Sequence, residues 1–173
     1  MAYTTIDDPS AHFQTKKYTG NGNSNHAITF DGNSNMQPDW LWNKVVSASD
    51  SHASFDSSRG VNKILYPNQA LAEGTDGNGN LESFDSNGFT IGSSSVYNNS
   101  GKSYVAWCWK AGGTAVSNTD GTIASSVSAN PAGGFSIVRN TGTASYTDTI
   151  GTGLNQAPEL VIEEPEDEEA TGI

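Results

Sequence analysis

Turn-forming residues interrupt this sequence at short intervals, and this spacing limits the fold more than any other feature. Clusters of Gly, Asn, Asp and Ser recur about every 8 to 12 residues, with short alternating apolar runs between them. Such intervals accommodate β-strands but not long helices. Gly, Ser, Asn and Thr are abundant, whereas the helix-favouring residues Leu, Met, Lys and Arg are scarce. The sequence therefore predicts an all-β protein with antiparallel strands, arranged as a β-sandwich.

The strand candidates share an alternation of apolar and polar residues. They are FQTKKYTG (13–20), DWLWNKVV (39–46), SHASFDSS (51–58), VNKILY (61–66), GFTIGS (88–93), YVAWCWKA (104–111), TIASSVSA (122–129), GFSIVRNTG (134–142) and PELVIEE (158–164). The pair Asn87-Gly88 predicts a hairpin turn before GFTIGS. Only NQALAEG (68–74) has a helical pattern, and it predicts a turn or two at most.

A faint internal repeat divides the chain. FQTKKYTG (13–20) is similar to FSIVRNTG (135–142), and QPDWLWNK (37–44) is similar to APELVIEE (157–164). We interpret the pattern as one full module followed by a truncated second one. The predicted units are an N-terminal arm (1–12), a β-sandwich module (13–111), additional strands or a truncated repeat (112–162) and an acidic tail (163–173).

Acidic residues are concentrated near the C-terminus. Seven of the 19 acidic residues lie there, so the formal net charge of -11 describes that end more than the rest of the chain. On its own such a tail is predicted to be disordered. We expect it to dock on a basic patch of a partner through Glu163, Glu164, Glu166, Asp167, Glu168 and Glu169. The few basic residues are scattered, which argues against nucleic-acid binding because phosphate contacts need a basic face.

The single cysteine, Cys108, has no second cysteine with which to form an internal disulfide, which fits synthesis in a reducing cytoplasm. The N-terminal segment MAYTTIDDPS lacks the charged and apolar regions of a signal peptide. No apolar stretch approaches the roughly 18 residues that cross a membrane. We therefore expect a soluble chain without a membrane partner.

No pattern in the sequence predicts an active site or a metal site. His12, His26 and His52 have no metal-ligand spacing, and no G-x-S-x-G motif is present. The segment DGNGNLE (76–82) begins like a calcium loop but lacks the later Gly and Glu, so we interpret it as a polar turn. No acidic pair suggests glycoside hydrolysis. We expect no enzymatic activity, no cofactor and no bound metal.

The segment HASFDSSRG (52–60) brings Asp56 and Arg59 close together in the sequence. One interpretation is a site that binds sugar hydroxyls through these two side chains. The other is a buried or half-buried Asp–Arg pair that holds a turn. The second interpretation is favoured, and the first is kept as an alternative.

The four tryptophans occur as two W-x-W pairs, Trp40 with Trp42 and Trp107 with Trp109. On a strand, each pair shares one face, while Cys108 lies on the opposite face. Because the chain has few aliphatic residues, we expect Trp107 and one of Trp40 or Trp42 to fill the core. The remaining tryptophans, with Trp109 among them, are candidates for an aromatic platform that stacks on sugars. We expect the two pairs to face each other across the sandwich or to lie side by side in one sheet.

Six segments together resemble a known module. They are YTTIDDPSAHFQTKKYTGNG, PDWLWNK, DSSRGVNKILYPN, SFDSNGFTIG, SYVAWCWKAGG and GFSIVRNTG. In this order they resemble a module of tailed-phage structural proteins, especially marine ones, usually described only as a domain of unknown function in tail-fibre or virion proteins. The resemblance covers about residues 2 to 158 and implies a lectin-like β-sandwich, a virion role and no catalytic residues. After residue 158, acids replace the basic strand usual in that family.

These observations lead to two expectations about function. The first is a structural component of a tailed-phage virion surface, as a capsid decoration, head-fibre or tail-fibre protein. It would be made in the host cytoplasm, adopt a jelly-roll sandwich over 13–111, and act by self-association and docking on other virion proteins. The alternative is a lectin-like receptor-binding module that recognises host surface glycans through Trp40, Trp42, Trp109, Asp56 and Arg59.

Overall fold

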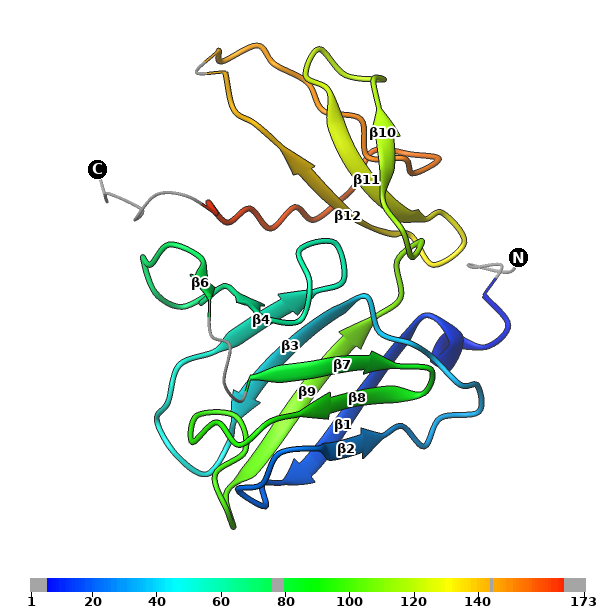
Figure 1. The fold of residues 1–173 in the computed structure, drawn as a ribbon. Helices are drawn as coiled ribbons and strands as arrows, with labels where there is room; N and C mark the ends of the chain where they lie inside the picture. Colours follow the sequence, from blue (N-terminus) through cyan, green and yellow to red (C-terminus); the bar gives the residue numbers. More distant parts are fainter. Residues whose placement is uncertain (1–5, 76–79, 144, 167–173) are drawn as a thin grey trace.

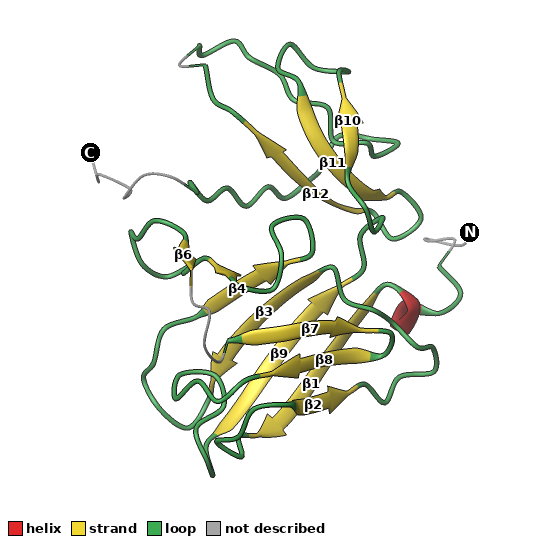
Figure 2. Ribbon diagram, viewed as in Figure 1, coloured by secondary structure: helices red, strands yellow, loops and turns green. Residues whose placement is uncertain are grey.

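The computed structural model describes residues 6–75, 80–143 and 145–166, which consist mainly of antiparallel β-strands and loops (Figure 1, Figure 2). A single turn of 3-10 helix, η1 (Pro9–Ala11), precedes the first strand. The predicted all-β class with antiparallel sheets is therefore confirmed. No helix in the described ranges is long and apolar enough to cross a membrane.

Two sheets form the body of the molecule. The four-stranded sheet has the order β1 (Phe13–Thr19), β9 (Ser103–Trp109), β3 (Trp40–Val45) and β4 (Ala53–Asp56). The three-stranded sheet of the body has the order β2 (His26–Thr29), β8 (Gly88–Ile91) and β7 (Leu81–Asp85). Figure 1 shows the second sheet lying across one face of the first. The strand β9 is central, as its apolar character on both faces predicts.

The core lies between these two sheets. Alternate residues of β9, Tyr104, Ala106 and Cys108, are fully buried there. The ring of Tyr18 stacks on Tyr104 at 5.1 Å and meets Phe89 of the second sheet edge-on at 6.1 Å. Burial raises the pKa of Tyr18, so its hydroxyl stays protonated and donates to the Tyr97 carbonyl oxygen at 2.9 Å. One continuous apolar cluster thus joins both sheets.

The predicted hairpin before GFTIGS is present. Strands β7 and β8 pair antiparallel with Asp85 opposite Gly88, so Ser86 and Asn87 form the turn. Gly88 has a φ of 130°, and a Cβ at this position would collide with the carbonyl oxygen of Ile28 in β2. Glycine is required here because only it adopts this backbone without steric cost.

A third sheet lies beyond the end of β9 (Figure 1). Its strands are β10 (Val116–Asn118), β11 (Ser125–Asn130) and β12 (Phe135–Asn140). The Ser128 hydroxyl accepts from the Gly112 N–H at 3.0 Å and donates to the Gly113 carbonyl oxygen at 2.7 Å. The Asn130 amide donates to the Lys110 carbonyl oxygen at 3.0 Å. These bonds fix the third sheet to the chain that leaves β9.

Three predictions about single segments are wrong or incomplete. PELVIEE (158–164) forms no strand, because its backbone pairs with no sheet, and Leu160 remains 75% exposed. NQALAEG (68–74) forms no helix, since pairing of β5 (Lys63–Ile64) with β6 (Gly74–Thr75) keeps its end extended. Strands β2, β6, β7 and β10 were not among the predicted strands, because each has only two to five residues.

The predicted repeat is reproduced only in its first block. The two similar segments of that block are both strands, β1 and β12, whereas the second block is a strand only in its first copy, β3. The proposed boundaries after residues 12, 111 and 162 stay predictions. The calcium-like start of DGNGNLE falls on residues 76–79, which lie outside the described residues.

The contact between the two body sheets can be tested by truncating Phe89. Its fully buried ring packs against Tyr18 and Phe30. We expect Phe89→Ala to lower the free energy of unfolding by about 3–5 kcal/mol, measured by urea denaturation. Tyr146→Ala is the control, because Tyr146 is fully exposed, and it should change stability by less than about 0.5 kcal/mol. Equal effects of the two substitutions would refute this description of the core.

Candidate functional site

The four tryptophans lie side by side on the outer face of the four-stranded sheet. The antiparallel register of β3 and β9 places Trp40 opposite Trp109 and Trp42 opposite Trp107. Ring centroids are 4.6 Å apart for Trp40 and Trp109, 5.8 Å for Trp40 and Trp42, and 6.3 Å for Trp42 and Trp107. All four side chains are half-buried. We call this group the tryptophan face.

The prediction that Trp107 and one tryptophan of β3 fill the core is wrong. The core takes the opposite faces of both strands, and on β3 these residues are Leu41, Asn43 and Val45. Strand alternation then points every tryptophan outward. The expectation that the two pairs lie beside each other in one sheet is confirmed, as is the burial of Cys108.

The two ends of the tryptophan face differ. At one end, Phe135 of β12 stacks on Trp40 at 5.8 Å and on Trp109 at 6.1 Å, so the third sheet covers part of these rings. At the other end, Trp42, His52, Trp107 and Trp109 line a cavity of about 250 Å³. The exposed wall of this cavity consists almost entirely of aromatic carbon. The cavity includes Trp42 and Trp109, two of the predicted platform residues, together with Trp107, which was predicted to lie in the core; stacking on sugars stays a prediction.

His52 is an additional member of the site that sequence reasoning did not assign to it. The Trp42 indole Nε1–H donates to His52 Nδ1 at 3.0 Å. His52 Nδ1 must therefore be unprotonated, and the ring proton lies on Nε2. Burial lowers the pKa of His52, and the charge of Lys44 lowers it further. The histidine is thus neutral at neutral pH, and its ring completes the aromatic wall.

Two lysines beside the tryptophan face have no carboxylate partner among the residues that the structure describes. The other six of the eight Lys and Arg residues form ion pairs with Asp or Glu. Lys17 of β1 and Lys44 of β3 both lie opposite Val105 of β9. Val105 precedes Trp107 by two residues on the same face of that strand. The Lys44 ammonium donates to the carbonyl oxygens of Val45 and Ala48, at 2.8 and 3.4 Å. Within the described part of the chain, no carboxylate therefore pairs with the positive charge of this face.

The predicted Asp–Arg pair is present and buried. The Arg59 side chain is only 3% exposed, and its Nε donates to Asp56 Oδ2 at 2.5 Å. Its Nη1 donates to Glu73 Oε2 at 3.1 Å, and Lys63 also pairs with Glu73 at 2.6 Å. Asp56 Oδ1 accepts from the N–H groups of residues 58 and 59, which closes the turn. This is the structural interpretation; a sugar-binding role for these two residues stays a prediction.

Part of the acidic tail lies against the protein itself (red in Figure 1). Glu166 accepts two hydrogen bonds from Arg139 of β12, at 2.8 and 2.7 Å, and these lower its pKa. Its carbonyl oxygen accepts from the Glu73 N–H at 3.1 Å. Glu163 is exposed and Glu164 is half-buried, while Asp167, Glu168 and Glu169 lie outside the described residues. Docking of the tail on a basic partner stays a prediction.

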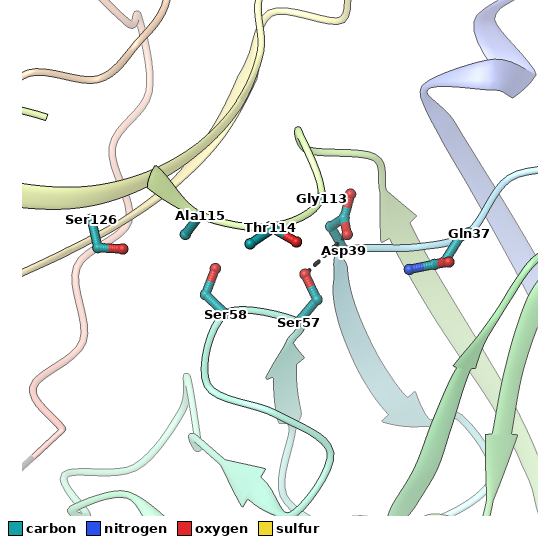
Figure 3. Close-up of a pocket in the computed structure, with 8 residues that line it drawn as sticks. All are labelled: Gln37, Asp39, Ser57, Ser58, Gly113, Thr114, Ala115 and Ser126. Atoms are coloured by element: carbon teal, nitrogen blue, oxygen red, sulfur yellow. Dashed lines mark hydrogen bonds between the residues drawn. The ribbon is translucent and has the colours of Figure 1, made fainter. Parts of the chain in front are cut away.

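A second, polar cavity of about 500 Å³ lies where the third sheet meets the body (Figure 3). Asp39 is fully buried at its edge, and its carboxylate accepts from the Ser57 hydroxyl at 2.9 Å and the Ala111 N–H at 2.8 Å. Lys110 pairs with the same carboxylate at 3.3 Å. These partners hold the Asp39 carboxylate in position at the edge of the cavity. No group of three potential metal ligands occurs among the described residues.

Fold and site together define an all-β protein with antiparallel sheets and a half-buried aromatic cluster on one sheet face. Residues 8–171 match a family described as a domain of unknown function, DUF7483, and the chain belongs to that family. Neither the curated proteins nor the solved structures contain a match to the chain.

The hydrogen bond between Trp42 and His52 makes the site sensitive to pH. Because the folded-state pKa of His52 is lowered from 6.5, folding favours the neutral ring. That contribution to stability is complete above pH 6.5 and is lost as pH falls toward the folded-state pKa. We expect NMR titration of His52 to give a midpoint below 6.5, with a parallel change in Trp fluorescence that is absent in His52→Gln. A midpoint at or above 6.5 would contradict the described environment.

The buried charge cluster predicts a large effect of Arg59. Removal of the guanidinium leaves Asp56 buried without its cation, so Arg59→Met should cost about 3–5 kcal/mol of stability. Arg139→Met is the matched control, because it removes the same charge from an exposed pair and should cost less than about 1 kcal/mol. Thermal and urea unfolding of both variants measure the difference. A cost for Arg59→Met no greater than for the control would show that the pair does not hold the turn.

Proposed function

We propose that the chain is a non-catalytic structural component of a tailed-phage virion surface and that the tryptophan face is its attachment surface. The resemblance of six sequence segments to phage virion modules supports the location. The partners are copies of the chain, other virion proteins or a host surface molecule, and binding needs neither cofactor nor metal.

The open end of the tryptophan face carries this proposal. Indole rings bury large areas on contact and dominate binding energies where they meet a partner. A cluster left half-exposed reduces the apolar area available to the core, so its position favours recognition over stability alone. Its rings come from the central strands β3 and β9, which hold them in fixed positions.

The architecture supports self-association as the structural part of this role. We propose that the two body sheets form a lectin-like β-sandwich of jelly-roll type, since one apolar cluster joins them. Strand β1 lies at one edge of the four-stranded sheet, where a neighbouring copy can pair, whereas Ser54 of the other edge strand, β4, is already paired with Leu65. Closed homo-oligomers built from such contacts are common among assembly proteins.

A lectin-like receptor-binding role is the second candidate, and the aromatic wall of the cavity favours it. Sugar rings present an apolar C–H face that stacks on indoles, and a cavity of about 250 Å³ accommodates a single ring. The half-buried Trp42, Trp107 and Trp109 supply such stacking faces. This role is compatible with a position on the virion surface.

Labelling of particles tests the proposed location. We expect gold-labelled antibodies against the purified chain to decorate gradient-purified virions of the phage that encodes it, as seen by electron microscopy. Antibody pre-absorbed with the chain is the control. Chain that is abundant in infected cells but absent from purified particles would reject the virion role.

A further inference from the structure

We propose that the cavity at the open end of the tryptophan face binds an acidic saccharide, with one sugar ring on the indoles and its acidic group between Lys17 and Lys44. The inference rests on the proposed function, because it names the ligand of the proposed attachment surface. It rests on the aromatic wall, on two lysines that pair with no carboxylate in the described ranges, and on the pairing of the strands beneath them.

The aromatic wall determines the size and kind of the ligand. The cavity has a volume of about 250 Å³, which is just below the range of about 300–1,000 Å³ that is typical of pockets for larger ligands. Trp42 meets Trp107 at a ring angle of 68°, so the two indoles form a corner instead of one flat surface. Such a corner receives one ring of a saccharide and leaves the neighbouring units in solvent.

The lysines determine the charge of the ligand. On the outer face of the sheet, Val105 of β9 lies between Lys17 of β1 and Lys44 of β3. The next pair on the same face is Trp107 of β9 and Trp42 of β3. Diagonal neighbours on adjacent strands are about 7–8 Å apart, which long side chains bridge. Lys44 follows Trp42 by two residues on the same face of β3, and its charge helps to lower the pKa of His52 in the cavity wall. In a chain with net charge -11, these two lysines beside one cavity favour an anionic group.

The strands beneath the cavity argue against an extended peptide as the ligand. Peptides that add to a sheet bind through unpaired main-chain groups at an edge. The tryptophan face lies on β9 and β3, each of which is paired on both sides. A peptide there would be held by side chains alone. Quaternary ammonium ions, which also bind aromatic cages, are disfavoured because both lysines repel them.

Short oligogalacturonides are the probe, compared with the same oligosaccharides after reduction of their carboxylates to alcohols. We expect the acidic form to bind more tightly in calorimetry and to quench Trp fluorescence, and we expect its affinity to fall as salt increases. Lys17→Gln should weaken binding about threefold to fivefold, as expected for an exposed ion pair. Lys16→Gln is the matched control, because Lys16 is adjacent, carries the same charge and pairs with Asp31; it should leave affinity unchanged.

Trp107→Ala should abolish binding, and Trp107→Phe, which keeps a ring, should retain part of it; circular dichroism verifies the fold of both variants. Equal binding of the reduced oligosaccharide, or equal effects of Lys17→Gln and Lys16→Gln, would overturn the acidic specificity but leave the attachment surface intact. Binding of choline or of a peptide ELVIEE, without binding of either saccharide, would also overturn the inference. Antibody labelling of virions tests the proposed location independently of all these results.

Discussion

The antiparallel pairing of β9 with β1 on one side and β3 on the other is the interaction on which the rest of the structure depends. It fixes which residues of β9 face the second sheet, because successive side chains point to opposite faces. Tyr104, Ala106 and Cys108 enter the core, and Trp107 and Trp109 must then point outward. A register shift of one residue would exchange these two sets and remove both the core and the tryptophan face.

The same pairing gathers the charges of the tryptophan face. Lys17 and Lys44 are distant in the sequence, yet both lie opposite Val105. The other basic residues are occupied by carboxylates, most clearly Arg59, which is buried between two acids. Among the described residues, the ion-paired bases thus stabilise the fold. Lys17 and Lys44, which have no carboxylate partner there, are the bases that we propose to recognise a ligand. They also give an otherwise acidic chain one local preference for anions.

Period-two alternation predicted much of the fold but not the face that each strand buries. The strong strands β3 and β9, the hairpin at Asn87-Gly88 and the buried Asp–Arg pair follow from local patterns. The position of the tryptophans does not follow from local patterns, because both faces of β9 are apolar. Only the packing of the second sheet determines which face of β9 is buried. The alternation WLWNK also places Lys44 on the face of Trp40 and Trp42, so that residue was accessible to sequence reasoning. The sequence did not place Lys17 or His52 at the site. Lys17 reaches it through the pairing of β1 with β9, and His52 lies in the loop before β4.

Acrylamide quenching of Trp fluorescence in the native protein is the most direct measurement of the central claim, that the tryptophans lie on an outer face. All four side chains are half-buried, and none belongs to the core cluster. We predict substantial quenching in the folded state, well above that of a fully buried indole. A native emission that resists acrylamide until the protein unfolds would instead place the tryptophans in the core.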